Sequence, residues 1–508
     1  MIYGNVIKSK TDKDIPLFTD GRSMHSKYNP EKEAQTFCQS SSPFFNIVFG
    51  IGGGFHLRAL LSLYPDVSLI AVEADDESLV FCLELEENKI LKGNSNLHFC
   101  TVKSLAQNIR EFYLPSLYGN LNVMYWRSWQ VFNQNLVPVM EGNIKEGISE
   151  VSADFSVQSH FGKLWHKNIL LNLKSLKDNK LDKKIDTGLT ASIIAAGPSL
   201  DESINRLKEN RSNTIIFSTD TAYGPLMKNN IVPDFVVSVD SQRVSLTHFM
   251  TLPFEGPKPV FILDISCPLS LSAMLYERGY PVFFITTGHP LSVLAKDYMN
   301  LPCLYSGAGT VTIASLDFAR YLGFTRFILY GADFSYNSGK AYARGTYLDN
   351  NFSLESSRID NSETRFDSLM FRTELSEGKD DNPFTPGLRR RKTTQTMKRY
   401  EKTTLDWVLK HDGKVKDYII YVPLSQREVS VPFTFSYETF IEEYLKNLET
   451  LYSQGPVEKN KYLFASLPYI SWCRKYIKDK ENPALKDLLQ KTYRQTVRYN
   501  KENEIIKK

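Results

Sequence analysis

The stretch Ala191-Ser-Ile-Ile-Ala-Ala-Gly-Pro-Ser-Leu200 decides the fold of the larger part of the chain. Its apolar half predicts a buried strand, and the residues from Ser199 onward predict a helix. Ser199 and Glu202 have the spacing of a capping box, which marks the start of that helix. A glycine turn between a strand and a helix N-terminus gathers N–H groups where an anion can bind. An ordinary βα turn has the same pattern, so neighbouring motifs must separate the two interpretations.

Short apolar strands alternate with helical segments from this point on. The expected strands are residues 191–196, 215–218, 235–239, 260–263, 282–285 and 327–330. Continuous apolar strands between helices are typical of a parallel sheet that is covered on both faces. The fold class is therefore α/β, with a doubly wound, mostly parallel sheet of Rossmann type.

An earlier segment has a similar layout. Residues 44–49 predict a strand that leads into Gly50-Ile-Gly-Gly-Gly54, then a helix and a second strand that ends at Glu73. A carboxylate about 20 residues after a glycine-rich turn can accept a hydrogen bond from a ribose hydroxyl. The segment resembles the first half of a class I methyltransferase domain. A vestigial or ligand-sensing site is favoured over a working methyl-donor site.

Three regions follow from these patterns and from a charged stretch at residues 174–187. We expect a Rossmann-like domain over residues 1–178, a central catalytic domain over 186–436 and a helical region over 437–508. The chain has 508 residues, which suits about three domains.

Composition excludes some classes of function. The formal net charge is only +4, so nucleic acid is not the expected partner. The six cysteines are scattered without metal-ligand spacing, and no apolar run is long enough to span a bilayer. The start has no signal-peptide pattern, and we expect a cytoplasmic protein without a metal site.

Polar residues gather where the expected strands end. In a doubly wound sheet, ligands bind at the carboxyl ends of the strands. The residues at these ends are Gly197, Asp220, Asp240, Asp264, His289 and Asp333. A second glycine turn, Ser306-Gly307, precedes a helix that runs to Gly323 without an acid in its first turn. We therefore expect the Ser306-Gly307 turn to bind the anionic part of a ligand. Gly197 is expected to contact the nucleoside part.

The ordered set of these motifs resembles a known family. The motifs are Ala195-Ala-Gly-Pro-Ser-Leu200, Asp220, Val232-Pro-Asp-Phe-Val-Val-Ser-Val-Asp240, Ser306-Gly307 and Gly331-Ala-Asp-Phe334. The set is similar to the central domain of the motility-associated factor (Maf) proteins. These are flagellin glycosyltransferases whose core resembles bacterial sialyltransferases that use CMP-sialic acid. Counting the N-terminal segments, the resemblance spans about residues 23–421.

The resemblance implies roles for single residues. Gly197, Pro198 and Ser199 would lie against the CMP moiety, and Asp220 and Asp240 stand where the sialyltransferases carry asparagines. Ser306 and Gly307 match their Ser-Gly turn. Tyr336 and Tyr342 match the two tyrosines that hold the departing phosphate, and Asp333 is expected on the same donor-binding side.

One departure concerns the catalytic base. The sialyltransferases place a histidine after the second tyrosine, but this chain has none between Tyr342 and Lys410. Among the residues at strand ends, His289 and Asp240 are the candidates for that role.

The sequence therefore predicts an inverting glycosyltransferase. It would move a sialic, pseudaminic or legionaminic type of sugar from its CMP ester to a Ser or Thr of flagellin. No cofactor is required, although magnesium stays open. The alternatives are a diphosphotransferase that resembles 6-hydroxymethyl-dihydropterin pyrophosphokinase, and a non-catalytic flagellin-binding accessory protein.

Overall fold

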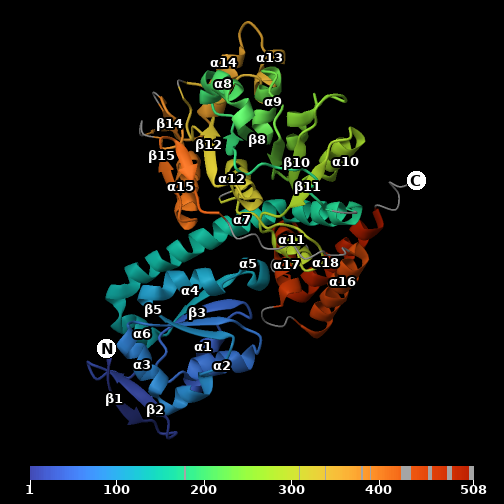
Figure 1. Ribbon diagram of the computed structural model, residues 1–508. Coiled ribbons are helices and arrows are strands. Elements are labelled where there is room, and N and C mark those ends of the chain that lie inside the picture. Colours follow the sequence, from blue (N-terminus) through green and yellow to red (C-terminus); the bar gives the residue numbers. More distant parts are fainter. Residues whose placement is uncertain are drawn as a thin grey trace. The chain divides into compact units, whose positions relative to one another are not determined.

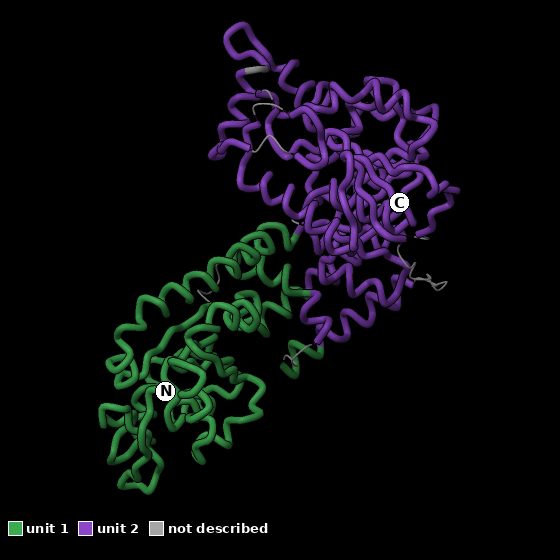
Figure 2. The backbone as a smooth tube through the Cα atoms, turned by 60° about the vertical axis from the view of Figure 1, so that its left-hand side comes forward, with its two compact units in different colours: residues 1–163, 450–456, 466–492 green, residues 164–449, 457–465, 493–508 purple. Residues whose placement is uncertain are grey.

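The computed structural model describes residues 1–176, 179–307, 309–337, 339–378, 382–388, 391–424, 436–455, 460–477 and 483–502. The chain forms two compact units (Figure 2). Unit 1 comprises residues 1–163, 450–456 and 466–492, and unit 2 comprises 164–449, 457–465 and 493–508. The boundary between the units along α7 lies at residues 163 and 164, and the expected regions 1–178, 186–436 and 437–508 stay a prediction. The C-terminal helices contribute residues to each unit.

Unit 1 contains a four-stranded parallel sheet in the order β5-β4-β3-β6. Its strands are β3 (Phe45–Phe49), β4 (Leu69–Glu73), β5 (Leu97–Thr101) and β6 (Leu121–Tyr125). The hairpin of β1 (Tyr3–Lys8) and β2 (Asp14–Phe18) precedes it. Its helices are α1 (Pro30–Cys38), α2 (Phe55–Leu63), α3 (Asp76–Glu84), α4 (Leu105–Phe112), α5 (Pro115–Tyr118) and α6 (Arg127–Phe132). The first βαβ element agrees with the predicted Rossmann layout.

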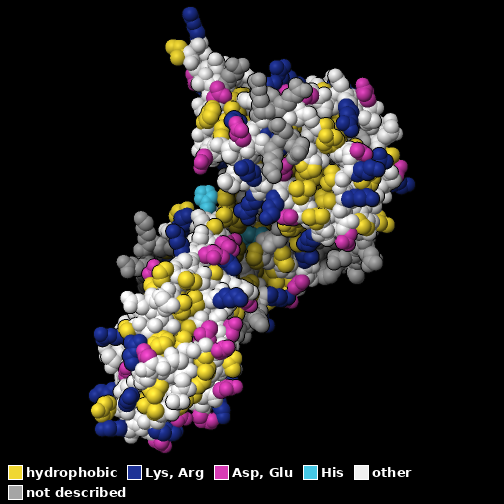
Figure 3. All heavy atoms as spheres, turned by 90° about the vertical axis from the view of Figure 1, so that its left-hand side faces the viewer, with side chains coloured by type: hydrophobic (Ala, Val, Ile, Leu, Met, Phe, Trp, Pro, Cys, Tyr) yellow, Lys and Arg dark blue, Asp and Glu magenta, His cyan; other side chains and the backbone are white. Residues whose placement is uncertain are grey.

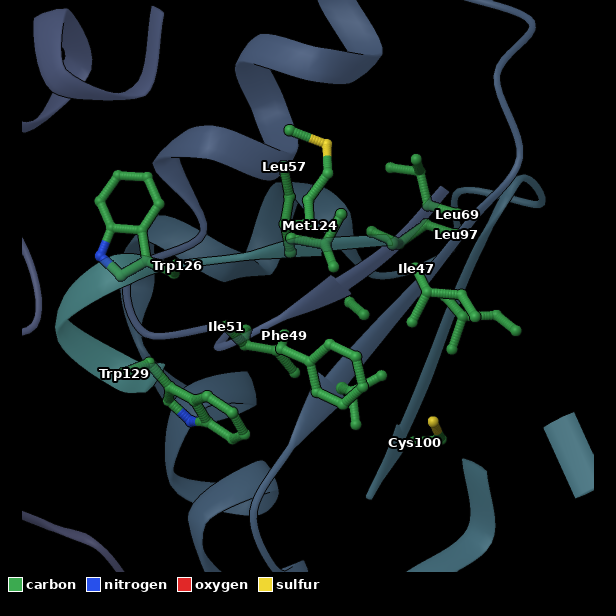
Figure 4. Close-up of a cluster of buried hydrophobic side chains, with 14 of the residues drawn as sticks. Ile47, Phe49, Ile51, Leu57, Leu69, Leu97, Cys100, Met124, Trp126 and Trp129 are labelled. Carbon is green, nitrogen blue, oxygen red and sulfur yellow. The ribbon is translucent and has the colours of Figure 1, made fainter. Parts of the chain in front are cut away.

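The core of unit 1 lies on both faces of this sheet. Figure 4 shows Ile47 and Phe49 of β3 among Leu69, Leu97 and Met124 from the other three strands. All five of β3's residues are buried, as expected for a central parallel strand.

Unit 2 is built on an eight-stranded sheet in the order β11-β10-β9-β8-β7-β12-β16-β15 (Figure 1). The strands are β7 (Thr190–Ile194), β8 (Thr214–Thr219), β9 (Phe235–Ser238), β10 (Val260–Asp264), β11 (Val282–Ile285), β12 (Arg326–Tyr330), β15 (Lys414–Lys416) and β16 (Ile419–Tyr421). The six from β7 to β12 are parallel, and the last two form an antiparallel hairpin. The mostly parallel sheet is confirmed, and the predicted strands match it within a few residues.

Helices cover both faces of this sheet. On one face, α12 and α15 bury residues such as Ile313 and Trp407. On the other, α8 and α9 bury residues such as Leu200, Leu207 and Leu226. The doubly wound arrangement is therefore confirmed.

The helices of unit 2 vary widely in length. They are α8 (Ser199–Glu209), α9 (Asp220–Lys228), α10 (Leu269–Glu277), α11 (Pro290–Ala295), α12 (Val311–Leu322), α13 (Tyr347–Leu354), α14 (Ser362–Met370) and α15 (Gln395–Lys410). Short 3-10 helices η4 (Arg211–Asn213) and η5 (Arg243–Phe249) follow α8 and β9, and a two-residue ladder joins β13 (Ser376–Glu377) to β14 (Lys392–Thr393). The long α7 (Val137–Ser175) begins in unit 1, and α16 (Tyr437–Gln454), α17 (Lys461–Tyr476) and α18 (Leu485–Glu502) follow at the C-terminus. Within the described helices, none has an apolar stretch sufficient for a bilayer crossing.

The surface carries mixed charge. On the face drawn in Figure 3, basic, acidic and hydrophobic side chains are interspersed over each unit. This mixture agrees with the small net charge of +4.

Candidate active site

The glycine turn after β7 packs against the chain's own backbone. The Gly197 N–H donates to the Gly331 carbonyl at 2.8 Å. A Cβ at position 197 would lie 2.5 Å from that carbonyl oxygen and 2.8 Å from the Asp333 carboxyl carbon. Gly197 was expected to let a ligand approach the backbone. In the structure, the absence of a side chain at Gly197 lets the backbone after β7 pack directly against the backbone after β12.

Asp333 caps α8 in place of the predicted capping box. The N-cap is Pro198, and no side-chain cap from Ser199 is formed. Instead the Asp333 carboxylate accepts hydrogen bonds from the Ser199 backbone N–H, at 2.9 Å, and from its hydroxyl. The capping-box prediction is wrong because a carboxylate from a distant strand satisfies these donors. Burial raises the pKa of Asp333 to about 6.

Two aspartates at the exits of β8 and β9 form the centre of a different group. Asp220 is buried, and it accepts hydrogen bonds from the Thr221 N–H at 2.7 Å and the Ser238 hydroxyl at 2.9 Å. Asp240 is half-buried and accepts one from the Gln242 N–H at 2.9 Å. Burial, and then the charge of Asp220, raise the pKa of Asp240.

A histidine joins these carboxylates from η5. His248 is half-buried, and its ring packs edge-on against Tyr347, with 4.5 Å between ring centroids. Burial lowers the pKa of His248, while the charges of Asp220 and Asp240 oppose that effect. The imidazole and two carboxylates therefore share one electrostatic environment. Sequence reasoning missed His248, because it lies eight residues beyond a strand exit in a segment without helical or strand periodicity.

Residues 342–347 bring two tyrosines to the same place. Three contacts anchor this segment over the starts of α8 and α9. The Ala343 N–H donates to the Ala196 carbonyl at 2.9 Å, and the Arg344 N–H donates to Asp201 at 3.0 Å. A Cβ on Gly224 of α9 would lie 2.5 Å from the Gly345 carbonyl, so only glycine allows that approach.

The phenols of this segment stay neutral over a wide pH range. Burial, and then Tyr336, Tyr347 and Asp220, raise the pKa of Tyr342 to about 12. Burial, and then Asp220 and Asp240, raise the pKa of Tyr347. Tyr342 is nevertheless 37% exposed, so a ligand can reach it. We call Asp220, Asp240, His248, Tyr342 and Tyr347 the strand-exit cluster.

Helix α15 links the second glycine turn to this cluster. A Cβ on Gly307, whose φ is +58°, would lie 2.6 Å from Cγ2 of Thr403. Tyr400, one turn earlier on α15, contributes to the raised pKa of Tyr342. Residues three apart share one helix face, so Ser306-Gly307 and Tyr342 both border α15. The helix after the turn is α12 (Val311–Leu322), with Thr310 as its N-cap and the predicted Gly323 as its C-cap.

His289 occupies a different environment. Its Nδ1 accepts a hydrogen bond from the Leu291 N–H at 3.1 Å, which caps α11, and its ring packs edge-on against Trp165. Burial lowers its pKa to about 3. No contact described for His289 reaches Asp240, Tyr336 or Tyr342. The geometry does not favour His289 as a base, because its ring is committed to a helix end.

Residues around the cluster hold the strand exits in place. Asn168 of α7 donates to the carbonyls of Ser241 and Ser266 at 3.1 and 2.8 Å. Buried Asp264 accepts hydrogen bonds from Ser266 and Thr287 at 2.7 Å, so it joins two loops and is not presented to a ligand. In the part of the chain that is described, no three His, Cys, Asp or Glu side chains converge as a metal site would require.

The glycine turn of unit 1 is filled by the protein itself. Glu73, expected to meet a ribose, is fully buried and accepts hydrogen bonds from Tyr3, the Ile51 N–H and Trp129. A Cβ on Gly52 would lie 2.5 Å from His25 Nε2, which accepts a hydrogen bond from the Gly53 N–H. Glu73 and two N–H groups of the turn are therefore engaged by the protein's own groups.

Together, fold and site describe a doubly wound α/β protein with an imidazole, two carboxylates and tyrosines at the carboxyl edge of its sheet. A family model described as 6-hydroxymethylpterin diphosphokinase MptE-like matches residues 167–339, about a third of the chain. Two proteins of Treponema pallidum (strain Nichols), each named "Uncharacterized protein", are 40% identical over 167 residues and 32% identical over 247. The matches cover 32% and 48% of this chain, and 77% of each relative. The chain belongs to the same family as these treponemal proteins.

One solved structure is also similar. It is titled as a MAf glycosyltransferase from Magnetospirillum magneticum AMB-1, and the match has a TM-score of 0.48 and 14% identity. It covers 98% of this chain and 87% of the other. At this identity the match carries no weight for the activity.

Proposed function

We propose that this chain is a glycosyltransferase that moves a nonulosonic acid, of sialic, pseudaminic or legionaminic type, from its CMP ester to a Ser or Thr of flagellin. The observation that carries the proposal is the strand-exit cluster. It combines a half-buried histidine beside two carboxylates with phenols of raised pKa. This transfer needs two kinds of group. One is a base that deprotonates the acceptor hydroxyl, and the other is a neutral hydrogen-bond donor to the departing phosphate.

The proposed reaction is a single inverting displacement. The acceptor oxygen forms a bond to the anomeric carbon, and the bond from that carbon to the CMP phosphate oxygen breaks. The electron pair of the broken bond leaves with CMP. The proton of the acceptor hydroxyl passes to His248, whose imidazolium Asp240 and Asp220 then stabilise.

The tyrosines act on the departing phosphate. Tyr342, with Tyr336 nearby, donates hydrogen bonds to the oxygen on which charge develops. A phenol whose pKa is about 12 donates without giving up its proton. Ser306 and Gly307, at the start of α12, supply backbone N–H groups for the same phosphate, and no acid lies in that first turn.

A second candidate is a diphosphotransferase acting on a pterin alcohol. The family match over residues 167–339 favours it, and the neighbouring carboxylates Asp220 and Asp240 could hold magnesium with ATP. The third candidate, a non-catalytic flagellin-binding protein, was suggested by the missing histidine after Tyr342. His248 offers an alternative base, which weakens that reason.

Nucleotide preference tests the proposal. We expect CMP to raise the thermal unfolding midpoint of the purified protein more than ATP with magnesium does. A response to ATP that requires magnesium would favour the diphosphotransferase. If no cytidine nucleotide shifts the midpoint, the glycosyltransferase proposal fails. Mass spectrometry of flagellin from cells with and without the gene then identifies the transferred sugar.

A further inference from the structure

A cavity of about 470 Å³ lies at the opposite edge of the unit 2 sheet from the strand-exit cluster. Most of its lining residues lie in segments that lead into strands, whereas the residues of the cluster follow strands. Residues 230–234 lead into β9, and Pro257 and Lys258 lead into β10. The volume is in the range of small-molecule sites. Nothing in the proposed reaction uses this cavity.

Basic side chains from four segments converge on it. They are Lys183, Lys208, Arg211 and Lys258, and Asp234 is the one acid in the lining. The formal charge of these five groups is therefore +3. Lysines and arginines gathered from separate elements, with a single acid, favour an anionic ligand.

Three of the four cationic groups are held in place. Asp234 pairs with Lys183 Nζ at 3.3 Å and with Arg211 Nη2 at 3.1 Å, and it also accepts a hydrogen bond from the Ile216 N–H. Lys258 Nζ donates to the Arg278 carbonyl at 2.6 Å. Lys208, in the last turn of α8, is exposed and makes no hydrogen bond or ion pair with a described residue. Three cations that are already ordered, and one exposed cation without a partner among the described residues, can bind an anion at little ordering cost.

The remaining wall is apolar. Pro233, Pro257 and Ile231 line the cavity beside the charges. An inorganic anion would leave this wall in water, whereas a ligand with an apolar part would cover it.

We propose that this cavity binds a small organic phosphate, with the phosphate against Lys183, Lys208 and Arg211 and the apolar part against Pro233 and Pro257. The site is separate from the donor-binding site of the proposed reaction. The inference does not rest on the glycosyltransferase proposal.

Lysine acetylation footprinting of the full-length protein tests the site. The probes are CMP and inorganic phosphate, two ligands of similar charge, compared with sodium chloride of equal ionic strength. We expect CMP to slow the acetylation of Lys208 by about tenfold at saturation, and phosphate to need about tenfold more ligand because it does not cover the apolar wall. Lys296, an exposed lysine outside the cavity, should be labelled at an unchanged rate.

Variants separate this site from the strand-exit cluster. Lys208→Glu should weaken CMP protection of Lys183 by about tenfold, whereas the matched Lys296→Glu should not change it. Protection should persist in Asp240→Asn, even if that protein has lost all transfer activity. Equal slowing at Lys208 and Lys296, or no slowing at either, would overturn the site. Equal potency of CMP and phosphate would overturn the organic ligand.

Discussion

At the scale of the residue, His248 and His289 differ in the groups that surround each imidazole, and this difference decides which of them can act as a base. The charges of two carboxylates act on His248, whose ring packs against that of Tyr347, whereas His289 accepts a backbone hydrogen bond at the start of α11. A group that caps a helix is not available for proton transfer. His248 is therefore the residue to test as base.

We expect His248→Gln to lower kcat by about 10²- to 10⁴-fold, the usual contribution of a general base. The base must be neutral to accept a proton, and burial lowers the pKa of His248 below its ordinary 6.5. The wild-type rate should therefore fall as the pH drops through that lowered pKa, and the variant should lose this acid limb. A pH profile of kcat measures both effects.

His289→Ala is the control for this experiment. It should cost about 1 kcal/mol of unfolding free energy through the lost cap and leave the pH profile unchanged. If His289→Ala removes the acid limb and His248→Gln does not, the assignment of the base is reversed.

Tyr342 tests the leaving-group side of the reaction. Tyr342→Phe removes one neutral donor, so we expect kcat to fall by about 10²-fold while the Kd for CMP stays within about threefold. Tyr418→Phe, on a tyrosine of similar exposure (42%), should change neither value. Equal turnover of Tyr342→Phe and wild type would remove Tyr342 from the mechanism. Turnover assays and calorimetric titration with CMP provide the two measurements.

At the scale of the element, the start of α8 depends on a residue more than 130 positions away. The Asp333 carboxylate satisfies the Ser199 N–H and hydroxyl, and the carboxylate is buried. The helix N-terminus is thereby tied to the exit of β12.

The burial of Asp333 predicts a pH dependence of stability. The pKa of Asp333 is about 6 in the folded protein and 3.8 when unperturbed. A raised pKa means that the folded state binds the proton more tightly. The resulting stability is present below about pH 4 and is lost as the pH rises through 6. From the two pKa values, the loss amounts to about 3 kcal/mol.

Asp333→Asn keeps the shape of the side chain and removes the titration. The unfolding free energy of wild type minus that of the variant should therefore fall by about 3 kcal/mol between pH 4 and pH 7. Chemical denaturation at several pH values measures it. Asp367→Asn, on the exposed face of α14, should show no such trend. A difference that does not change with pH would refute the protonation of Asp333.

At the scale of the whole molecule, the C-terminal helices belong to both units. In unit 1, the Arg474 guanidinium donates to the carbonyls of Ser116, Leu117 and Pro483 at 2.7, 2.9 and 3.1 Å. In unit 2, Tyr437 donates to Asn500, and His166 bonds to Thr496. The C-terminal helices therefore make side-chain contacts within each unit.

Arg474→Ala should lower the unfolding free energy of unit 1 by about 2 kcal/mol, because three carbonyl groups lose a charged donor. Hydrogen exchange around residues 114–119 should become faster. Lys475→Ala, which changes an exposed neighbour, should leave both measurements unchanged. Equal effects of the two variants would show that the Arg474 contacts contribute nothing specific.

Much of the fold could be predicted because its signals are local. The strands around Ile193, Val237 and Ile262 are apolar runs, and their burial on both faces of a parallel sheet follows from that pattern. The hairpin of β15 and β16 was missed, because strands of three residues have too little pattern to recognise.

The candidate site could be predicted only in part. Asp220, Asp240 and Tyr342 were predicted because they follow strands or match a motif, and in the structure their charges influence one another. His248 and Tyr347 could not be found in this way. Their approach depends on how η5 and the segment before α13 pack, which no short stretch of sequence encodes.

The sequence by itself determined the order of strands and helices, the glycines at the turns and the set of polar residues at the strand ends. Only the tertiary structure decided which of those residues are available to a ligand. Asp333 and Asp264 accept hydrogen bonds from donors in other segments, and His289 caps its own helix, whereas Asp240 and His248 stay half-exposed at one edge. The physical reason is that hydrogen-bond satisfaction and burial are set by residues far apart in the chain.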